Sequence, residues 1–138
     1  AGHTADAQAY EALMDAFART GRPKEAIALL ARMAEVGLPI SAIAHDIVIN
    51  ACAKAGQAEE ATAWLGKMAR AQLRPDHVSY GSAISACANA WRVDAAVKWF
   101  DTMEAAGIVP NIITYTSIIH ACTKAGRVRM AGEWLERI

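Results

Sequence analysis

Cysteine and histidine are the residues of this sequence that could form a disulfide or hold a metal ion. The cysteines are Cys52, Cys87 and Cys122, and the histidines are His3, His45, His77 and His120. No His or Cys pair recurs at the spacing of a zinc site, so the sequence predicts neither a metal nor a cofactor. The cysteines stand 35 residues apart, and Phe17 stands 35 residues before the first of them. Because a position that accepts phenylalanine is a packing position, we expect three free thiols in a core.

Catalytic residue patterns are absent from the sequence. It contains no His-x-Glu with Cys-x-x-Cys, no Gly-rich phosphate loop, and no Ser-x-x-Lys or Gly-x-Ser-x-Gly nucleophile. The carboxylates Glu11, Asp15 and Asp46 group loosely, without further acidic residues at nuclease-like positions, and we interpret them as surface groups. The sequence therefore predicts a protein that is not an enzyme and has no small-molecule substrate.

Composition and charge exclude several further classes of protein. The chain has 138 residues, of which 54% are hydrophobic and 20% charged, and 14 basic residues balance 14 acidic ones. Such a chain folds around a core, and with zero net charge it can bind nucleic acid only through a local patch. No apolar run approaches the roughly 20 residues of a membrane span, so no membrane partner is expected. We also expect no targeting peptide in this segment, because a cationic leader followed by an apolar stretch is missing.

The 35-residue spacing of the cysteines is a period of the whole sequence. Tryptophans repeat at 64, 99 and 134, methionines at 33, 68 and 103, and alanines at 26, 61, 96 and 131. The period predicts full repeats at 7–41, 42–76 and 77–111, a partial repeat at 112–138, and the end of a preceding repeat at 1–6. We expect the chain to be one segment of a longer array.

Each repeat contains two stretches with helical spacing of apolar residues. In the first stretch Tyr10, Leu13, Met14 and Phe17 stand at i, i+3, i+4 and i+7, and the second stretch follows a break such as Gly21-Arg22-Pro23. The residues at 41, 76 and 111 are Ser, Asp and Asn, which favour an N-cap of the next helix. Two helices per repeat and no strand pattern predict an all-α fold, an α-solenoid.

Residues 113–128, Ile-Thr-Tyr-Thr-Ser-Ile-Ile-His-Ala-Cys-Thr-Lys-Ala-Gly-Arg-Val, and residues 107–111, Gly-Ile-Val-Pro-Asn, resemble the pentatricopeptide repeat (PPR) family. The resemblance covers essentially the whole chain. It implies a right-handed superhelix of helix-turn-helix hairpins whose first helices line a concave face. It also implies single-stranded RNA as the partner, about one base per repeat, and an organellar location in a mitochondrion or chloroplast.

The resemblance also implies which residues face the RNA bases. The second residue of a repeat is an aliphatic wedge, matched here by Ile43, Val78 and Ile113 but not by Gln8. The fifth and last residues of a repeat choose the base: the pairs are Glu11 with Ser41, Asp46 with Asp76, and Gly81 with Asn111, and Thr116 begins a fourth pair. A carboxylate only accepts hydrogen bonds and repels phosphates, so we expect weak base reading at Glu11 and Asp46. Thr116 is expected to read a base, with a leaning towards purines.

Phosphate contacts in the family come from a cation near the end of the first helix. Arg19, Lys54 and Lys124 match that position, and Asn89 interrupts the row. Three cations spaced one per repeat could follow an RNA backbone. The alternative is helix capping, because a cation in the last turn of a helix is favourable in itself.

The tryptophans have two interpretations. Trp64, Trp99 and Trp134 lie in the second helix, so we expect them to pack between repeats rather than to stack on bases. Trp91 replaces the glycine found at the turn of the other repeats. It is expected either to pack against a neighbouring repeat or to be exposed for a partner, and we favour packing.

The sequence thus predicts a PPR-type single-stranded RNA-binding module of organellar RNA metabolism, acting in processing, stability, editing or translation. The alternative is a scaffold that binds neighbouring repeats or protein subunits within an organellar ribonucleoprotein or other large complex, in which base reading at Glu11, Asp46 and Gly81 has been lost.

Overall fold

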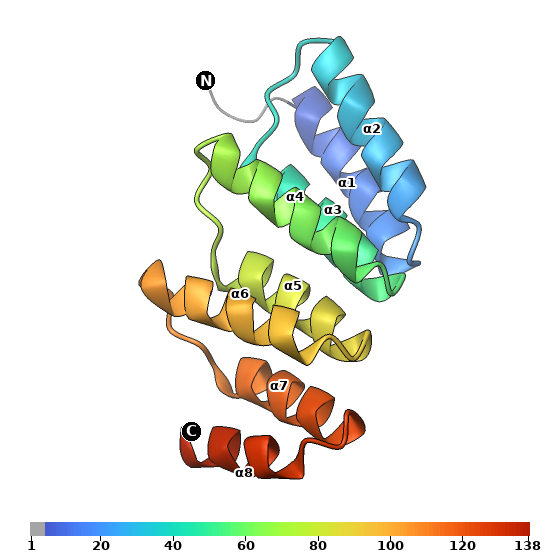
Figure 1. Cartoon of the computed structure of the whole chain (residues 1–138). Helices are drawn as coiled ribbons and strands as arrows, with labels where there is room; N and C mark the ends of the chain where they lie inside the picture. The colour runs from blue at the N-terminus through green and yellow to red at the C-terminus, as the bar shows by residue number, and fades with distance from the viewer. Residues whose placement is uncertain (1–4) are drawn as a thin grey trace.

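The computed structural model describes residues 5–138, which form eight helices and no strand (Figure 1). The helices are α1 (Ala5–Arg19), α2 (Pro23–Glu35), α3 (Ala42–Lys54), α4 (Ala58–Arg70), α5 (His77–Asn89), α6 (Val93–Ala105), α7 (Ile112–Lys124) and α8 (Val128–Glu136). They follow one another as four antiparallel pairs, so the predicted all-α solenoid is confirmed. The expected end of a preceding repeat at 1–6 falls mostly outside the described residues.

Capping side chains set where the first helix of each later pair begins. Ser41 accepts a hydrogen bond from the Ala44 amide at the start of α3. Asp76 accepts from the amides of Val78 and Ser79 in α5, and Asn111 accepts from that of Thr114 in α7. Each bond satisfies a backbone donor that has no partner within its helix, so the predicted N-caps are confirmed.

Left-handed residues end the first helix of every pair. Gly21, Gly56 and Gly126 have φ values of 70°, 74° and 76°, a region that glycine adopts without steric cost. In the third pair Trp91 takes this place, with φ 62°. The hydrogen bonds of its turn follow the common pattern, because the Arg92 amide donates to the Cys87 carbonyl as the Gln57 amide does to that of Cys52. The backbone of the turn is thus kept although the side chain is unfavourable there.

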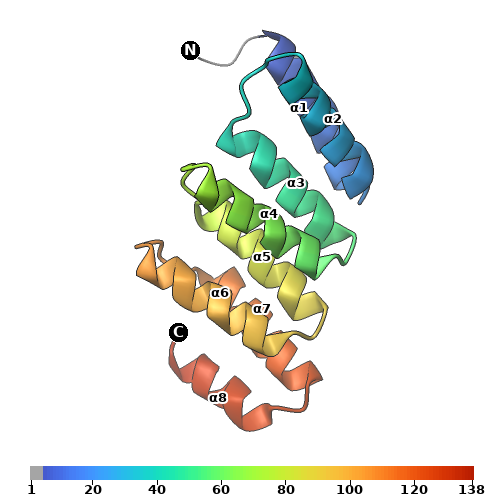
Figure 2. The same ribbon diagram turned by 45° about the horizontal axis from the view of Figure 1, so that its top comes forward.

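The helices form two layers, in which α1, α3, α5 and α7 stack on one side and α2, α4, α6 and α8 on the other (Figures 1 and 2). The backbone of each first helix contacts that of the next first helix. Each second helix contacts its own first helix, and α2, α4 and α6 also contact the first helix that follows. No two second helices have their backbones in contact among the described residues. The first helices are therefore the more closely stacked layer.

Side chains bridge the wider gap between second helices at one edge. Arg92 forms an ion pair with Glu59 at 2.8 Å, and Arg127 forms the equivalent pair with Asp94 at 3.0 Å, one repeat later. Between the first two repeats the corresponding residues are Gln57 and Lys24, which cannot form such a pair. All four paired side chains are largely exposed, so these ion pairs add little stability.

The core contains the sulfur-bearing columns of the sequence. Cys52, Cys87 and Cys122 are free and buried, as predicted, and Met33, Met68 and Met103 are fully buried beside them. Burial raises the pKa of the Cys52 thiol to about 11, with the Glu60 carboxylate adding to the effect, and raises the pKa of the other two thiols. The thiols therefore serve as small apolar groups rather than as nucleophiles.

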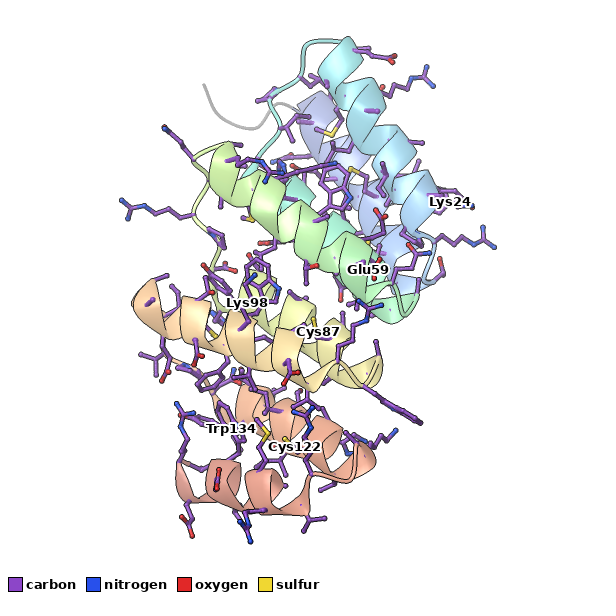
Figure 3. The ribbon with its side chains drawn as sticks, in the orientation of Figure 1. Lys24, Glu59, Cys87, Lys98, Cys122 and Trp134 are labelled. Atoms are coloured by element: carbon purple, nitrogen blue, oxygen red, sulfur yellow. The ribbon has the colours of Figure 1, made fainter. Side chains whose placement is uncertain are left out.

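The tryptophan column also packs inside the molecule. Trp64 and Trp134 are buried, and Trp99 is partly buried. The ring of Trp64 meets His45 and that of Trp99 meets Tyr80, each on the first helix of the same hairpin. Trp134 meets Tyr115 in its own hairpin and Phe100 in the preceding one, with ring centroids 4.7 Å apart in the second case. Figure 3 labels Trp134 and Cys122, both in the last hairpin.

The prediction that Trp91 packs against a neighbouring repeat is wrong. Its side chain is 61% exposed, whereas the other tryptophans are buried or partly buried. The physical reason is the turn: a residue with φ 62° at the end of α5 projects from the hairpin edge, where no neighbouring helix covers it.

Candidate RNA interface

Three large aliphatic side chains lie exposed in the same place on three successive first helices. Ile43, Val78 and Ile113 are each the second residue of their helix, and they are 53%, 49% and 70% exposed. The capping residue two positions earlier fixes where each helix begins, so the three side chains share one orientation relative to the stack. This row of uncovered apolar groups is the wedge position of the sequence analysis.

The fifth residue of the first repeat and its last residue are in direct contact. The Ser41 hydroxyl donates a hydrogen bond of 2.9 Å to the Glu11 carboxylate, which is only 7% exposed. Glu11 projects from α1 and Ser41 caps α3, so the close stacking of these helices brings the pair together. The carboxylate is directed into this contact, which limits what it can offer to a base.

A serine joins the two carboxylates of the second repeat. The Ser79 hydroxyl donates to the Asp46 carboxylate and also lies 3.1 Å from a carboxylate oxygen of Asp76. Burial raises the pKa of Asp46, and the negative charge of Asp76 raises it further, whereas the Ser79 bond opposes the shift. The pair of residues that would read a base is thus engaged within the protein.

The predicted base-reading positions of the third and fourth repeats are more open. A side chain at Gly81 would meet no atom within 4 Å of its Cβ, so this position faces free space. Its partner Asn111 accepts from the amide and hydroxyl of Thr114 while capping α7. Thr116 is exposed, and its hydroxyl donates 2.7 Å to the Ile112 carbonyl, which leaves an oxygen able to accept from a base.

Two grooves of similar size run between the first helices. The α3/α5 groove has a volume of about 280 Å³, and its lining includes Asn50, Lys54, Gly81, Ser85 and Asn89. The α5/α7 groove has a volume of about 290 Å³, and its lining includes Asn89, Ile112, Ile113, Thr116, Ser117 and His120. Residues 35 apart take equivalent places in the two, so the grooves repeat with the sequence.

The three predicted phosphate-binding cations are the last residues of α1, α3 and α7. Lys54 lines the α3/α5 groove, and Lys124 is exposed. Neither takes part in an ion pair within residues 5–138, whereas Arg19 is held by Asp15 at 2.9 Å. All three also lie in the last turn of their helices, where a cation is favourable in the field of the C-terminus.

Three groove-lining side chains that were not predicted from the sequence stand one helical turn beyond the fifth residue of the second, third and fourth repeats. Asn50, Ser85 and His120 occupy this place, and all three line a groove. The i+4 spacing from Asp46, Gly81 and Thr116 is the signal that could have identified them, because it puts each pair on one helix face.

The described residues offer little to other kinds of site. Within residues 5–138 no group of three or more His, Cys, Asp or Glu side chains is placed to hold a metal ion. None of the helices described has the length and apolar character needed to cross a membrane.

Comparison with known proteins points to one family. The chain matches a family model described as PPR repeat family over residues 75–124, and the PPR repeat model over residues 9–38, 43–73 and 113–138. A search of curated proteins finds no match.

Solved structures of the same fold include the pentatricopeptide repeat protein PPR10 from maize, with a TM-score of 0.80 and 23% identity over 94% of this chain and 18% of that one. A structure of PPR10 in complex with an 18-nt psaJ RNA element gives 0.81 and 28% over 93% and 19%. The PPR domain of Arabidopsis thaliana protein-only RNase P 1, in complex with tRNA, gives 0.59 and 15% over 93% and 88%.

The chain spans less than a fifth of PPR10, so the likeness concerns the repeats. The family models together cover most of the sequence. The paired helices, the row of exposed aliphatic residues and these matches agree: the chain belongs to the pentatricopeptide repeat family.

Proposed function

We propose that this chain is a single-stranded RNA-binding module of organellar RNA metabolism that grips the strand with little sequence preference. The observation that carries the proposal is the row of Ile43, Val78 and Ile113, because folded proteins seldom leave aligned large aliphatic side chains uncovered without a partner. The flat faces of nucleobases fit between such wedges. The PPR10 structure in complex with RNA, at 28% identity, supports the same partner.

The charges near the grooves fit a protein that contacts the phosphates of the strand and recognises its bases only weakly. Lys54 and Lys124 provide cations on the first-helix layer, although the net charge of the chain is zero. Glu11 and Asp46 are engaged with Ser41 and Ser79, so the first two repeats offer bases few free hydrogen-bonding groups. The proposal gives this segment a binding role and no catalytic one.

Titration of a labelled oligouridine at low salt tests the proposal. If Arg19, Lys54 and Lys124 each contact a phosphate, the log-log salt slope is about −2, at about 0.7 per contact for single strands. Changing Lys54 and Lys124 together to Glu should abolish binding to all sequences alike, since phosphate contacts carry no sequence information.

The matched control changes Lys24 and Lys98 to Glu, because these lysines come from the second helices α2 and α6 (Figure 3). It alters net charge equally and should weaken binding far less. Equal loss in both double variants, or no binding by the unchanged chain at low salt, would contradict the proposal.

A protein-binding scaffold is the second candidate, and exposed Trp91 favours it. If the chain binds no RNA, pull-down with and without Trp91→Gly would test whether this edge binds a subunit of a larger complex.

A further inference from the structure

The two grooves between first helices differ in where they carry positive charge. Lys54 lines the α3/α5 groove, and Asn89 takes the equivalent place in the α5/α7 groove, 35 residues later. The α5/α7 groove therefore lacks the cation of its neighbour. It contains instead His120, at the place where the α3/α5 groove has Ser85. The lysine is missing from the groove that has gained a histidine.

His120 is placed where an RNA strand would pass if the proposed function holds. It stands four residues after Thr116 on α7, so both side chains lie on one face of the helix and line the same groove. Ile112 and Ile113 provide the apolar part of this groove, and both are largely exposed. A base lying against them would leave its ribose and phosphate near the polar side chains further along the helix.

No Asp, Glu, Lys or Arg side chain lines the α5/α7 groove together with His120 among the described residues. The α5 residues that line the groove, Ala88 and Asn89, are neutral, and no residue of α6 or α8 lines it. On α7 itself Lys124 stands one turn beyond His120 and adds positive charge. Arg127, at the start of α8, is paired with Asp94 of α6 at 3.0 Å.

Resting on the proposed function, we propose that His120 is a further RNA contact, whose protonated imidazole donates a hydrogen bond to a phosphate of the strand in the α5/α7 groove. In the α5/α7 groove His120 would contact a phosphate, as Lys54 is proposed to do in the α3/α5 groove. Histidine changes charge between about pH 5 and pH 8, so this contact makes RNA binding stronger in mild acid.

The experiment measures oligouridine affinity at pH ~5.5 and pH ~8 for the unchanged chain and for His120→Gln, His120→Lys and His77→Gln. We expect the unchanged chain to bind about three- to fivefold more tightly in acid, the equivalent of one exposed ion pair. His120→Gln should bind weakly at both values, and His120→Lys tightly at both. His77 is exposed but lines neither groove, so His77→Gln should keep the pH dependence.

Each outcome separates this inference from the function on which it rests. Asp46 is present in all four proteins, so any effect of its raised pKa cancels in the comparison. RNA binding whose pH dependence is unchanged in His120→Gln overturns the role of His120 and leaves the proposed function standing. Absence of binding by the unchanged chain at both pH values overturns both. His120 is exposed, so its variants should fold, which circular dichroism checks.

Discussion

Ser41 donates its hydroxyl proton to the Glu11 carboxylate at 2.9 Å while accepting a hydrogen bond from the Ala44 amide. One side chain thus caps α3 and partners a nearly buried carboxylate of α1. The two residues are the ones that would read a base together, and here their contact joins neighbouring repeats. The structural role and the predicted base-reading role therefore fall on the same atoms.

Because Ser41 has two roles, removing its hydroxyl group is expected to cause an unusually large loss of stability. Ser41→Ala should lower the free energy of unfolding by about 2 kcal/mol, because a cap and a hydrogen bond to a charged group are lost together. Asn111→Ala removes a cap that bonds no carboxylate and should cost about 1 kcal/mol. Urea denaturation of both variants measures the difference, and equal losses would contradict a role for the Glu11 contact.

Replacing Asp46 with asparagine is expected to stabilise the folded chain by an amount that depends on pH. Burial raises its pKa above the ordinary value of 3.8, so ionising this carboxyl costs free energy in the folded state. The folded chain therefore loses stability as pH rises through the folded-state pKa of Asp46, whereas below 3.8 the group is protonated in both states. Asp46→Asn should be more stabilising relative to the unchanged chain near pH ~7 than near pH ~3. Denaturation at both values decides, and a gain that is largest in acid would refute the argument.

Replacing Gly81 with asparagine is expected to raise the affinity for RNA. An asparagine there meets no atom within 4 Å of its Cβ and would place a donor and an acceptor beside Asn111. Gly81→Asn should tighten binding and introduce a preference among bases, and it should not destabilise α5, because glycine is the poorer helix former. Titration with oligouridine and oligoadenosine gives the preference. Gly132→Asn, on the second helix α8, serves as control, since its Cβ also meets nothing but lies outside both grooves.

The buried thiols predict slow labelling. A pKa of about 11 leaves very little Cys52 thiolate at neutral pH, and all three cysteines are covered. A thiol reagent should modify the native chain slowly and the denatured chain at all three sites without prior reduction. Cys87→Ala should cost roughly 1 kcal/mol, because the cavity left is small. Fewer than three reactive thiols after denaturation would indicate a disulfide.

Replacing Gln72 with glycine is expected to stabilise the folded chain. It has φ 60°, whereas Gly37 and Gly107 hold the equivalent place with φ 80°. Gln72→Gly should raise the free energy of unfolding by about 1 kcal/mol by removing left-handed strain from a side-chain-bearing residue. The reverse change, Gly107→Gln, meets no atom within 4 Å and should cost a similar amount through the backbone alone. Thermal denaturation of the two variants should show shifts of opposite sign.

The period of the sequence determined the fold. Each 35-residue unit contains two amphipathic stretches, a turn residue and a cap, all local features, so the eight helices and their starts at Pro23, Ala42 and Ile112 could be predicted from neighbouring residues alone. The burial of the cysteines followed from the same repetition, because a column that includes Phe17 must face the core.

Tertiary structure alone decided what the polar side chains contact. That Ser79 joins Asp46 to Asp76, or that Arg92 reaches Glu59, depends on the offset between two helices about one repeat apart in sequence. The exposure of Trp91 depends on the direction in which its turn leaves the hairpin. Periodicity says which face of a helix is apolar, but polar contacts require a few ångströms of accuracy between helices, and only the packing of the stack supplies that.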